Sequence, residues 1–133
     1  MFRKLRDWTF RRGDDNKGLP LGTRGECFAR KMVERHGLMV LAQNFRIARG
    51  EVDLTVRAGD CVVFIEVKTR GNDRYGMPFE AVGPIKQRKN ICAAEVFLKR
   101  FNPTPPCRFD VISIIQRGQA LEGEWIRDAF DAG

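Results

Sequence analysis

Acidic and basic side chains gather at the two ends of one apolar stretch, GEVDLTVRAGDCVVFIEVKTR, which spans residues 50–70. Glu51 and Asp53 lie at its beginning, and Glu66 and Lys68 lie at its end. Carboxylates are ligands that Mg²⁺ and Mn²⁺ prefer, and a lysine beside them can activate water and stabilise charge on an attacked phosphate. These residue types point to hydrolysis assisted by a divalent metal ion, provided that the fold brings them together.

A β-hairpin would bring the four side chains together. Residues 59–60, Gly-Asp, suit a two-residue type II′ turn because glycine stands at its first central position. Counting back along both strands places Asp53 opposite Glu66 and Glu51 opposite Lys68, all on one face of the hairpin. A four-residue loop gives the same pairing, whereas a three-residue loop or a bulge would not.

The facing carboxylates of Asp53 and Glu66 call for a cation, because opposed Cβ atoms are only ~4.5 to 5.5 Å apart and like charges there are destabilising. The oxygen ligands and the lack of histidine favour Mg²⁺ or Mn²⁺ over zinc. A solvated sheet face with one Glu–Lys ion pair is the alternative. The strand before Glu66 is apolar on both faces, which indicates a central strand and favours a metal or catalytic site.

Periodicity and turn residues predict the elements around this hairpin. Helices are expected over residues 23–36 and 84–101, strands over 39–47, 50–57, 60–68 and 107–115, and a mobile loop over 69–83. Residues 124–130 suit either a short edge strand or a helical turn. The order of helix, three strands, helix and strand predicts an α/β sandwich with a mixed sheet and helices packed on it.

Length and composition indicate one folded domain. The 133 residues are 43% apolar and 31% charged, which suits one hydrophobic core over residues 21–133 behind a flexible basic tail over residues 1–20. The formal net charge of +7 favours nucleic acid as a partner. No stretch has the length and apolarity of a membrane span or a signal peptide, so a cytoplasmic protein without a membrane partner is expected.

Cysteine and histidine contribute little to the predicted chemistry. The four cysteines form no CxxC pair and lie among apolar neighbours, which argues against a zinc site or a disulfide framework. His36 is the single histidine and lies near the end of a predicted helix. Histidine-dependent nuclease, protease and hydrolase mechanisms therefore have little support.

The motif resembles the PD-(D/E)XK nuclease core, in which an acid on one strand and an acid-x-lysine on the next bind magnesium and cut phosphodiesters. Val52 stands where that core usually has proline. The segments GTRGECFA, NFRIARGEVDL, VVFIEVKTR and RFDVI, over about residues 22–115, resemble the YraN-type family of small bacterial proteins, which are similar to archaeal Holliday-junction resolvases. The resemblance implies a restriction-endonuclease-like three-layer sandwich with the order α-β-β-β-α-β.

The resemblance also adds residues to the site. Glu26 matches an acid on the first helix that joins Asp53 and Glu66 at the metal, although Thr23-x-x-Glu26 equally reads as a capping box. Arg46 and Arg70 match positions that face phosphate.

Basic residues at the start of the second predicted helix form a further candidate contact with nucleic acid. Lys86, Arg88 and Lys89 crowd a position where the helix dipole disfavours positive charge, so a polyanion would relieve the conflict. A solvated basic face is the alternative for Arg88 and Lys89.

Together these observations favour a Mg²⁺- or Mn²⁺-dependent endonuclease that acts on branched or structured DNA, with a homodimer as a possible assembly. Asp53, Glu66 and Glu26 would hold the metal and Lys68 would assist the attacking water. A nucleic-acid-binding module that keeps the nuclease fold without cutting is the principal alternative. A protein-interaction domain whose acids only form ion pairs is a third.

Overall fold

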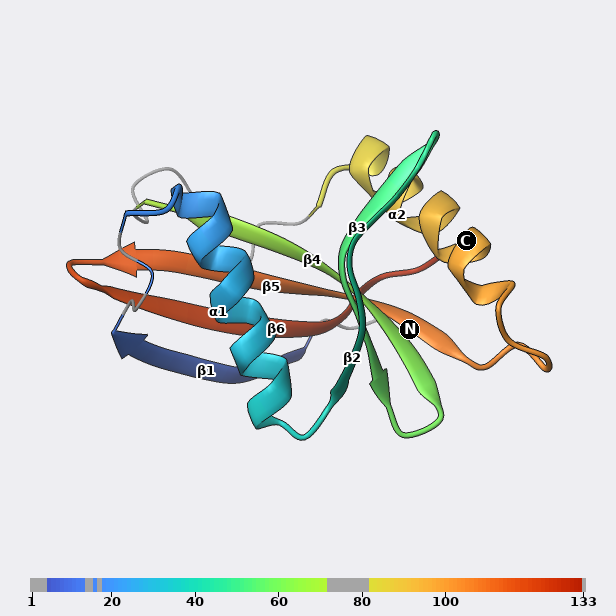
Figure 1. Ribbon diagram of the computed structural model, residues 1–133, viewed down its shortest axis with the longest axis horizontal. Coiled ribbons are helices and arrows are strands. Elements are labelled where there is room, and N and C mark those ends of the chain that lie inside the picture. The colour runs from blue at the N-terminus through green and yellow to red at the C-terminus, as the bar shows by residue number, and fades with distance from the viewer. Residues whose placement is uncertain (1–4, 14–15, 17, 72–81, 133) are drawn as a thin grey trace.

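The computed structural model of the chain describes residues 5–13, 16, 18–71 and 82–132. The elements follow in the order β1 (Leu5–Gly13), α1 (Leu21–Arg35), β2 (Met39–Ile47), β3 (Gly50–Ala58), β4 (Cys61–Arg70), α2 (Pro84–Leu98), β5 (Cys107–Arg117) and β6 (Ala120–Phe130) (Figure 1). The strands form one mixed sheet in the order β1-β6-β5-β4-β3-β2. Only β4 and β5 pair in parallel, and the chain between them crosses over through α2.

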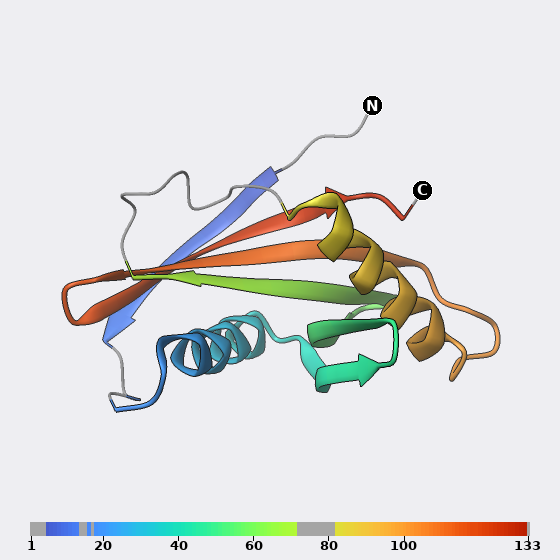
Figure 2. The same ribbon diagram turned by 90° about the horizontal axis from the view of Figure 1, so that it is seen from above.

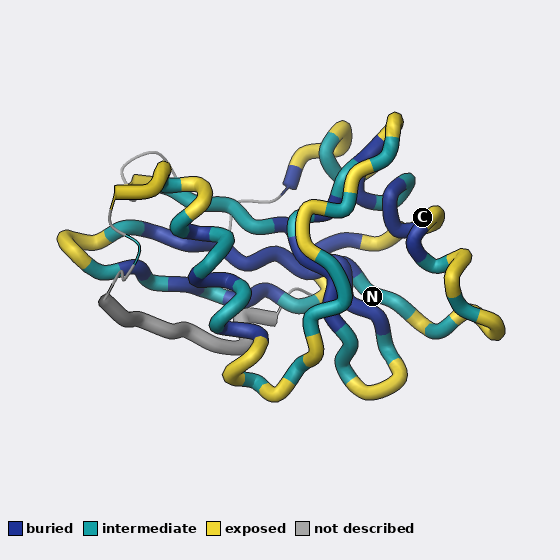
Figure 3. Tube along the Cα trace, viewed as in Figure 1, coloured by how far each residue is buried: buried dark blue, intermediate teal, exposed yellow. Residues whose placement is uncertain are grey.

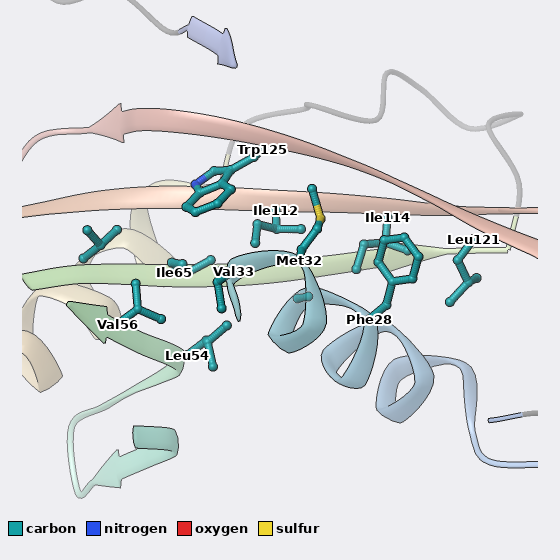
Figure 4. Packing of buried hydrophobic residues seen from close by; sticks show 12 residues of the cluster. Phe28, Met32, Val33, Leu54, Val56, Ile65, Ile112, Ile114, Leu121 and Trp125 are labelled. Atoms are coloured by element: carbon teal, nitrogen blue, oxygen red, sulfur yellow. The ribbon is translucent and has the colours of Figure 1, made fainter. Parts of the chain in front are cut away.

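The two helices cover opposite faces of the sheet, which gives three layers (Figure 2). One core cluster joins α1 residues such as Phe28 and Met32 to Leu54, Ile65 and Trp125 of the sheet (Figure 4). The other cluster joins α2 to the opposite face. Strand β4 is buried from Val62 to Glu66 and strand β5 from Phe109 to Ile115, as expected for central strands covered on both faces (Figure 3). The expected α/β sandwich with a central mixed sheet is confirmed.

The predicted hairpin register is confirmed where β3 and β4 pair. The ladder runs from Ala58 opposite Cys61 to Leu54 opposite Ile65. Gly59 has a φ of 63° in the turn, a conformation that glycine adopts without steric cost. Local turn chemistry and alternation of apolar residues were therefore sufficient to fix this pairing.

The C-terminal segment departs from the sequence prediction. Residues 120–130 form the long strand β6 between β5 and β1, not a short edge strand or helical turn. Leu121, Gly123 and Trp125 are buried at alternate positions, while Glu122 and Glu124 between them are half-buried. Gly123 obscures the alternation in the sequence, because it occupies a buried position without an apolar side chain.

The N-terminal segment also departs from it. The structure places Leu5–Gly13 as strand β1, paired antiparallel with β6, where a flexible tail was expected over residues 1–20. An unpaired edge of β6 offers backbone hydrogen bonds to an extended segment, whereas the short strand predicted over residues 124–130 would be too short to pair with the whole of Leu5–Gly13. The expected order α-β-β-β-α-β therefore lacks the first and the last strand. Of the mobile loop expected over 69–83, residues 69–70 belong to β4 and residues 72–81 lie outside the described residues.

Neither helix in the described part of the chain is long and apolar enough to cross a membrane.

Candidate functional site

The candidate site lies at a fork between β3 and β4. Their ladder ends at Leu54 and Ile65, after which β3 continues to pair with β2 and β4 continues to pair with β5. Beyond the fork, the Asp53 side chain takes over a bond to the neighbouring strand: its Oδ2 accepts a hydrogen bond of 2.8 Å from the Val67 N–H. The Asp53 carboxylate is thus held against β4 where the strands part.

Strand β3 twists as it leaves β4. Leu54 packs in the cluster on the α1 face, whereas Val52 packs in the cluster on the α2 face. Residues two apart in a regular strand share one face, so the strand turns over at Asp53 between them. Gly50 then meets α2 so closely that a Cβ atom there would lie 2.0 Å from the Lys89 carbonyl oxygen. This contact sets the beginning of β3 against the first turns of α2.

Two side chains of α2 contact the Glu66 carboxylate, which is only 9% exposed. Asn90 donates from Nδ2 to Glu66 Oε1 at 3.2 Å and to the Glu51 carbonyl oxygen at 2.7 Å. Lys86 Nζ lies 3.5 Å from Glu66 Oε2 and 3.0 Å from Glu51 Oε2. We refer to Glu51, Asp53 and Glu66 as the acidic cluster. Three elements, β3, β4 and α2, therefore position it.

Burial raises the pKa values of the two inner carboxyl groups, Asp53 and Glu66. Burial, and after it the negative charge of Asp53, raise the pKa of Glu66 to about 7, while Lys86 and Asn90 oppose the shift. Burial also raises the pKa of Asp53 above its usual value, although the Val67 N–H opposes this. The hydrogen bond from Lys86 lowers the pKa of the more exposed Glu51. Full ionisation of both inner carboxyl groups at neutral pH is therefore unfavourable unless further positive charge is added.

A divalent cation would supply the missing positive charge. The donors at the fork are all oxygens, which suits Mg²⁺ or Mn²⁺, and both ions usually complete their shell with water. Within the described ranges, no three His, Cys, Asp or Glu side chains converge closely enough to hold a metal ion by themselves. Asp53 and Glu66 therefore fit a metal held by two carboxylates, with the rest of its shell from solvent or substrate.

The repulsion at the fork predicts a pH dependence of folding stability. Because the folded-state pKa of Glu66 is raised from 4.5 to about 7, the folded state binds a proton more tightly than the unfolded chain, and stability falls as pH rises between these values. We expect Glu66→Gln to gain on the order of 2 kcal/mol over the wild type between pH 5 and pH 8. Urea denaturation in the presence of a chelator measures this gain.

The exposed Glu95 of α2 provides the matched control, and Glu95→Gln should show no such gain. If the free energies of unfolding of Glu66→Gln and the wild type changed in parallel with pH, the pKa of Glu66 would not be raised in the folded protein.

The structure does not group Glu26 with the acidic cluster. Glu26 lies in the second turn of α1, and its Oε1 accepts a hydrogen bond of 3.4 Å from Asn44 Nδ2 of β2. The capping-box alternative is wrong, because α1 begins at Leu21 and Thr23 already lies inside the helix. No bond links Glu26 to Asp53 or Glu66 in the portion of the chain that is described.

The lysine that contacts the acidic cluster is Lys86, where Lys68 was expected. Lys68 is half-buried on β4 beside Ser113 of β5, and among the described residues no hydrogen bond or ion pair involves it. Lys86, expected to face nucleic acid, is the lysine that contacts the acidic cluster.

The predicted basic residues flank the acidic cluster on two elements. Arg46 is exposed on β2 directly opposite Glu51, and Lys89 is exposed on α2. Both lie close enough to Glu51 for their charges to lower its pKa. Arg88 is exposed on the same helix, and Arg70 ends β4. The acidic cluster is therefore bordered by positive charge.

Asn90 is the site residue that the sequence analysis missed. It is buried, and its amide links β3 to β4 through the bonds to Glu51 and Glu66. A signal was present, because Lys86, Asn90, Ala93 and Phe97 follow a helical spacing of four, three and four residues. Asn90 thus shares a helix face with the apolar Ala93 and Phe97, and a polar residue in such a position indicates a buried hydrogen-bond partner.

A second buried carboxylate, Asp110 of β5, has a structural role. It accepts hydrogen bonds from Trp125 Nε1 and the Asp128 N–H, both at 2.9 Å, and pairs with Arg108 Nε at 3.1 Å. Asp128 has a positive φ of 55°, which non-glycine residues rarely adopt. Asp110 therefore holds the backbone of β6 in its irregular conformation at Asp128, and these contacts occupy its carboxylate.

The chain matches proteins that bear a family name and no stated activity. The model of uncharacterised protein family UPF0102 matches residues 25–114. A UPF0102 protein of Ectopseudomonas mendocina is 43% identical over 114 residues, which cover 84% of this chain and 95% of that protein. A UPF0102 protein of Geobacter metallireducens is 44% identical over 112 residues, covering 84% of this chain and 92% of that protein. The similarity thus extends over nearly the full length of these relatives.

Proposed function

The chain belongs to the uncharacterised protein family UPF0102, as its YraN-type motifs predicted, and we propose that it is a metal-dependent endonuclease that hydrolyses phosphodiesters in branched or structured DNA. The observation that carries the proposal is the pair of the half-buried Asp53 and the buried Glu66 at the fork of β3 and β4, where burial raises both pKa values. Such a pair is costly unless a cation or a reaction uses it. The α/β sandwich around the pair supports a restriction-endonuclease-like fold.

Each residue of the site has a distinct part in the proposed reaction. Asp53 and Glu66 would hold Mg²⁺ or Mn²⁺, which when bound would activate water and neutralise charge on the phosphate. Asn90 and the Val67 N–H hold the two carboxylates in place. Lys68, two residues beyond Glu66, would stabilise negative charge that develops on the attacked phosphate.

The charge around the acidic cluster supports DNA as the substrate. Arg46 on β2 and Arg88 and Lys89 on α2 are exposed, and the chain as a whole carries +7. Contacts to phosphate release counterions from DNA and position the backbone without reading the sequence. Such an interface suits recognition of DNA shape, which is what a branched substrate requires.

A non-catalytic nucleic-acid-binding module is the second candidate, and one observation favours it. The Lys86 ammonium already pairs with Glu51 and Glu66, so part of the acidic cluster is neutralised without a metal. Glu26, the expected third ligand, contacts Asn44. A binding module that does not use a metal would show the same ion pairs.

Incubation of the purified protein with linear, flapped and four-way-branched DNA tests the proposal. We expect cleavage with Mg²⁺ or Mn²⁺, none with chelator, and a preference for the branched substrates. Binding of these DNAs without cleavage under any of the metal conditions would favour the second candidate. Failure to bind any of them would contradict both.

A further inference from the structure

The Lys86 ammonium bridges carboxylates that come from two different strands. Its Nζ lies 3.0 Å from Glu51 Oε2 on β3 and 3.5 Å from Glu66 Oε2 on β4. Lys86 extends from the first turn of α2, where the helix dipole disfavours a positive charge. Contact with the carboxylates, not the helix, therefore keeps the ammonium in this position.

Neutral donors hold the Glu66 carboxylate and the backbone of Glu51 independently of Lys86. Glu66 Oε1 accepts from Asn90, which also donates to the Glu51 carbonyl oxygen, and the neighbouring Asp53 Oδ2 accepts from the Val67 N–H. Among the described residues, the oxygens that pair with the ammonium are Glu66 Oε2 and Glu51 Oε2. Departure of Lys86 would free one oxygen on each strand while the supporting bonds stayed intact.

We propose that Lys86 is an internal counterion that a divalent cation held by Asp53 and Glu66 would displace, which would free Glu51 Oε2 and Glu66 Oε2 from the ammonium. The inference rests on the proposed function, because it concerns the same metal site. A divalent ion carries twice the charge of an ammonium, and Mg²⁺ binds carboxylate oxygens at about 2.0 to 2.1 Å, closer than the 3.0 and 3.5 Å of Lys86. The Lys86 side chain is 32% exposed, so it has a path to solvent.

This exchange gives Glu51 and Lys86 a joint role at the metal site. In the absence of metal, the ammonium limits repulsion between Glu51 and Glu66. After displacement it remains tethered to the first turn of α2, beside the exposed Arg88 and Lys89, where it can pair with a phosphate. Lys86 is therefore a positioning residue that couples metal binding to phosphate binding.

Calorimetric titration of the metal-free protein with Mn²⁺ tests the exchange. If Lys86 competes with the metal, Lys86→Met should bind Mn²⁺ more tightly by roughly tenfold, within the usual range of coupling between two ligands of one protein. Lys86→Arg keeps a competing cation and should bind much as the wild type does. Lys99→Met makes the same change at an exposed lysine beyond the end of α2, and it should change the affinity little.

Each outcome of the titration decides a different question. Equal or weaker Mn²⁺ binding by Lys86→Met, beside measurable binding by the wild type, would overturn the displacement and leave the proposed function standing. No binding by either protein at millimolar Mn²⁺ would overturn both. If Lys86→Met does not fold, NMR of the lysine side chains of the wild type decides: Mg²⁺ should move the Lys86 signal toward that of the exposed Lys99, and an unchanged signal would overturn the inference.

Discussion

Asp53→Asn should abolish metal-dependent DNA cleavage and leave DNA affinity equal to or higher than that of the wild type. The substitution keeps the shape of the side chain, and the asparagine Oδ1 can still accept the hydrogen bond that the Val67 N–H donates to Asp53. It removes one of the two carboxylate charges that would hold the divalent ion. It also removes a negative charge that repels phosphate, so binding should not weaken. Cleavage of branched DNA and its binding, measured separately, give the two results.

Asp60→Asn is the matched control for this experiment. It makes the same chemical change at the exposed turn of the same hairpin, away from the fork, and should cleave at the wild-type rate. A preparation of Asp53→Asn that cuts DNA at the full rate would mean that the activity belongs to a contaminant or to another site. Glu66→Gln should behave like Asp53→Asn, since Asn90 can still donate to the glutamine oxygen.

The charged hairpin could be predicted from sequence because its information is local. Alternation with period two and the turn at residues 59–60 fix which residues face each other, and the structure has the predicted register from Ala58–Cys61 to Leu54–Ile65. Counting alone could not predict that the strands part at Asp53. The carboxylate bond to the Val67 N–H replaces strand pairing there, and only the position of α2 against Gly50 explains why β3 turns away.

Long-range contacts account for what the sequence analysis missed. Lys86 and Asn90 reach Glu66 only because the crossover through α2 places that helix over the beginning of β3. The periodicity of α2 predicts which residues share a face of the helix, but not which part of the sheet this face covers. Glu26 shows the same limit, because a helical pattern locates it on α1 without saying that its partner is Asn44.

Lys68→Ala should separate the chemical step from metal binding. In the part of the chain that is described, Lys68 makes no hydrogen bond or ion pair, so its removal leaves the bonds that hold Asp53 and Glu66 intact. Mn²⁺ affinity should therefore stay near the wild-type value. If Lys68 stabilises charge on the attacked phosphate, the cleavage rate should fall by ~10² to 10³-fold, as when one transition-state donor is deleted. Single-turnover cleavage at saturating metal, beside calorimetric titration with Mn²⁺, measures both quantities.

Because Lys86 forms the ion pairs with the acidic cluster, the same measurements distinguish the role of Lys68 from that of Lys86. If Lys86 were the lysine that assists the reaction, Lys68→Ala would cleave as fast as Lys99→Ala, a control at an exposed lysine beyond the end of α2. If both lysines contribute, each single variant slows cleavage, and only Lys86→Met also changes Mn²⁺ affinity, because only Lys86 contacts Glu51 and Glu66. A Lys68→Ala protein that loses metal affinity together with activity would contradict the division of labour proposed for the two lysines.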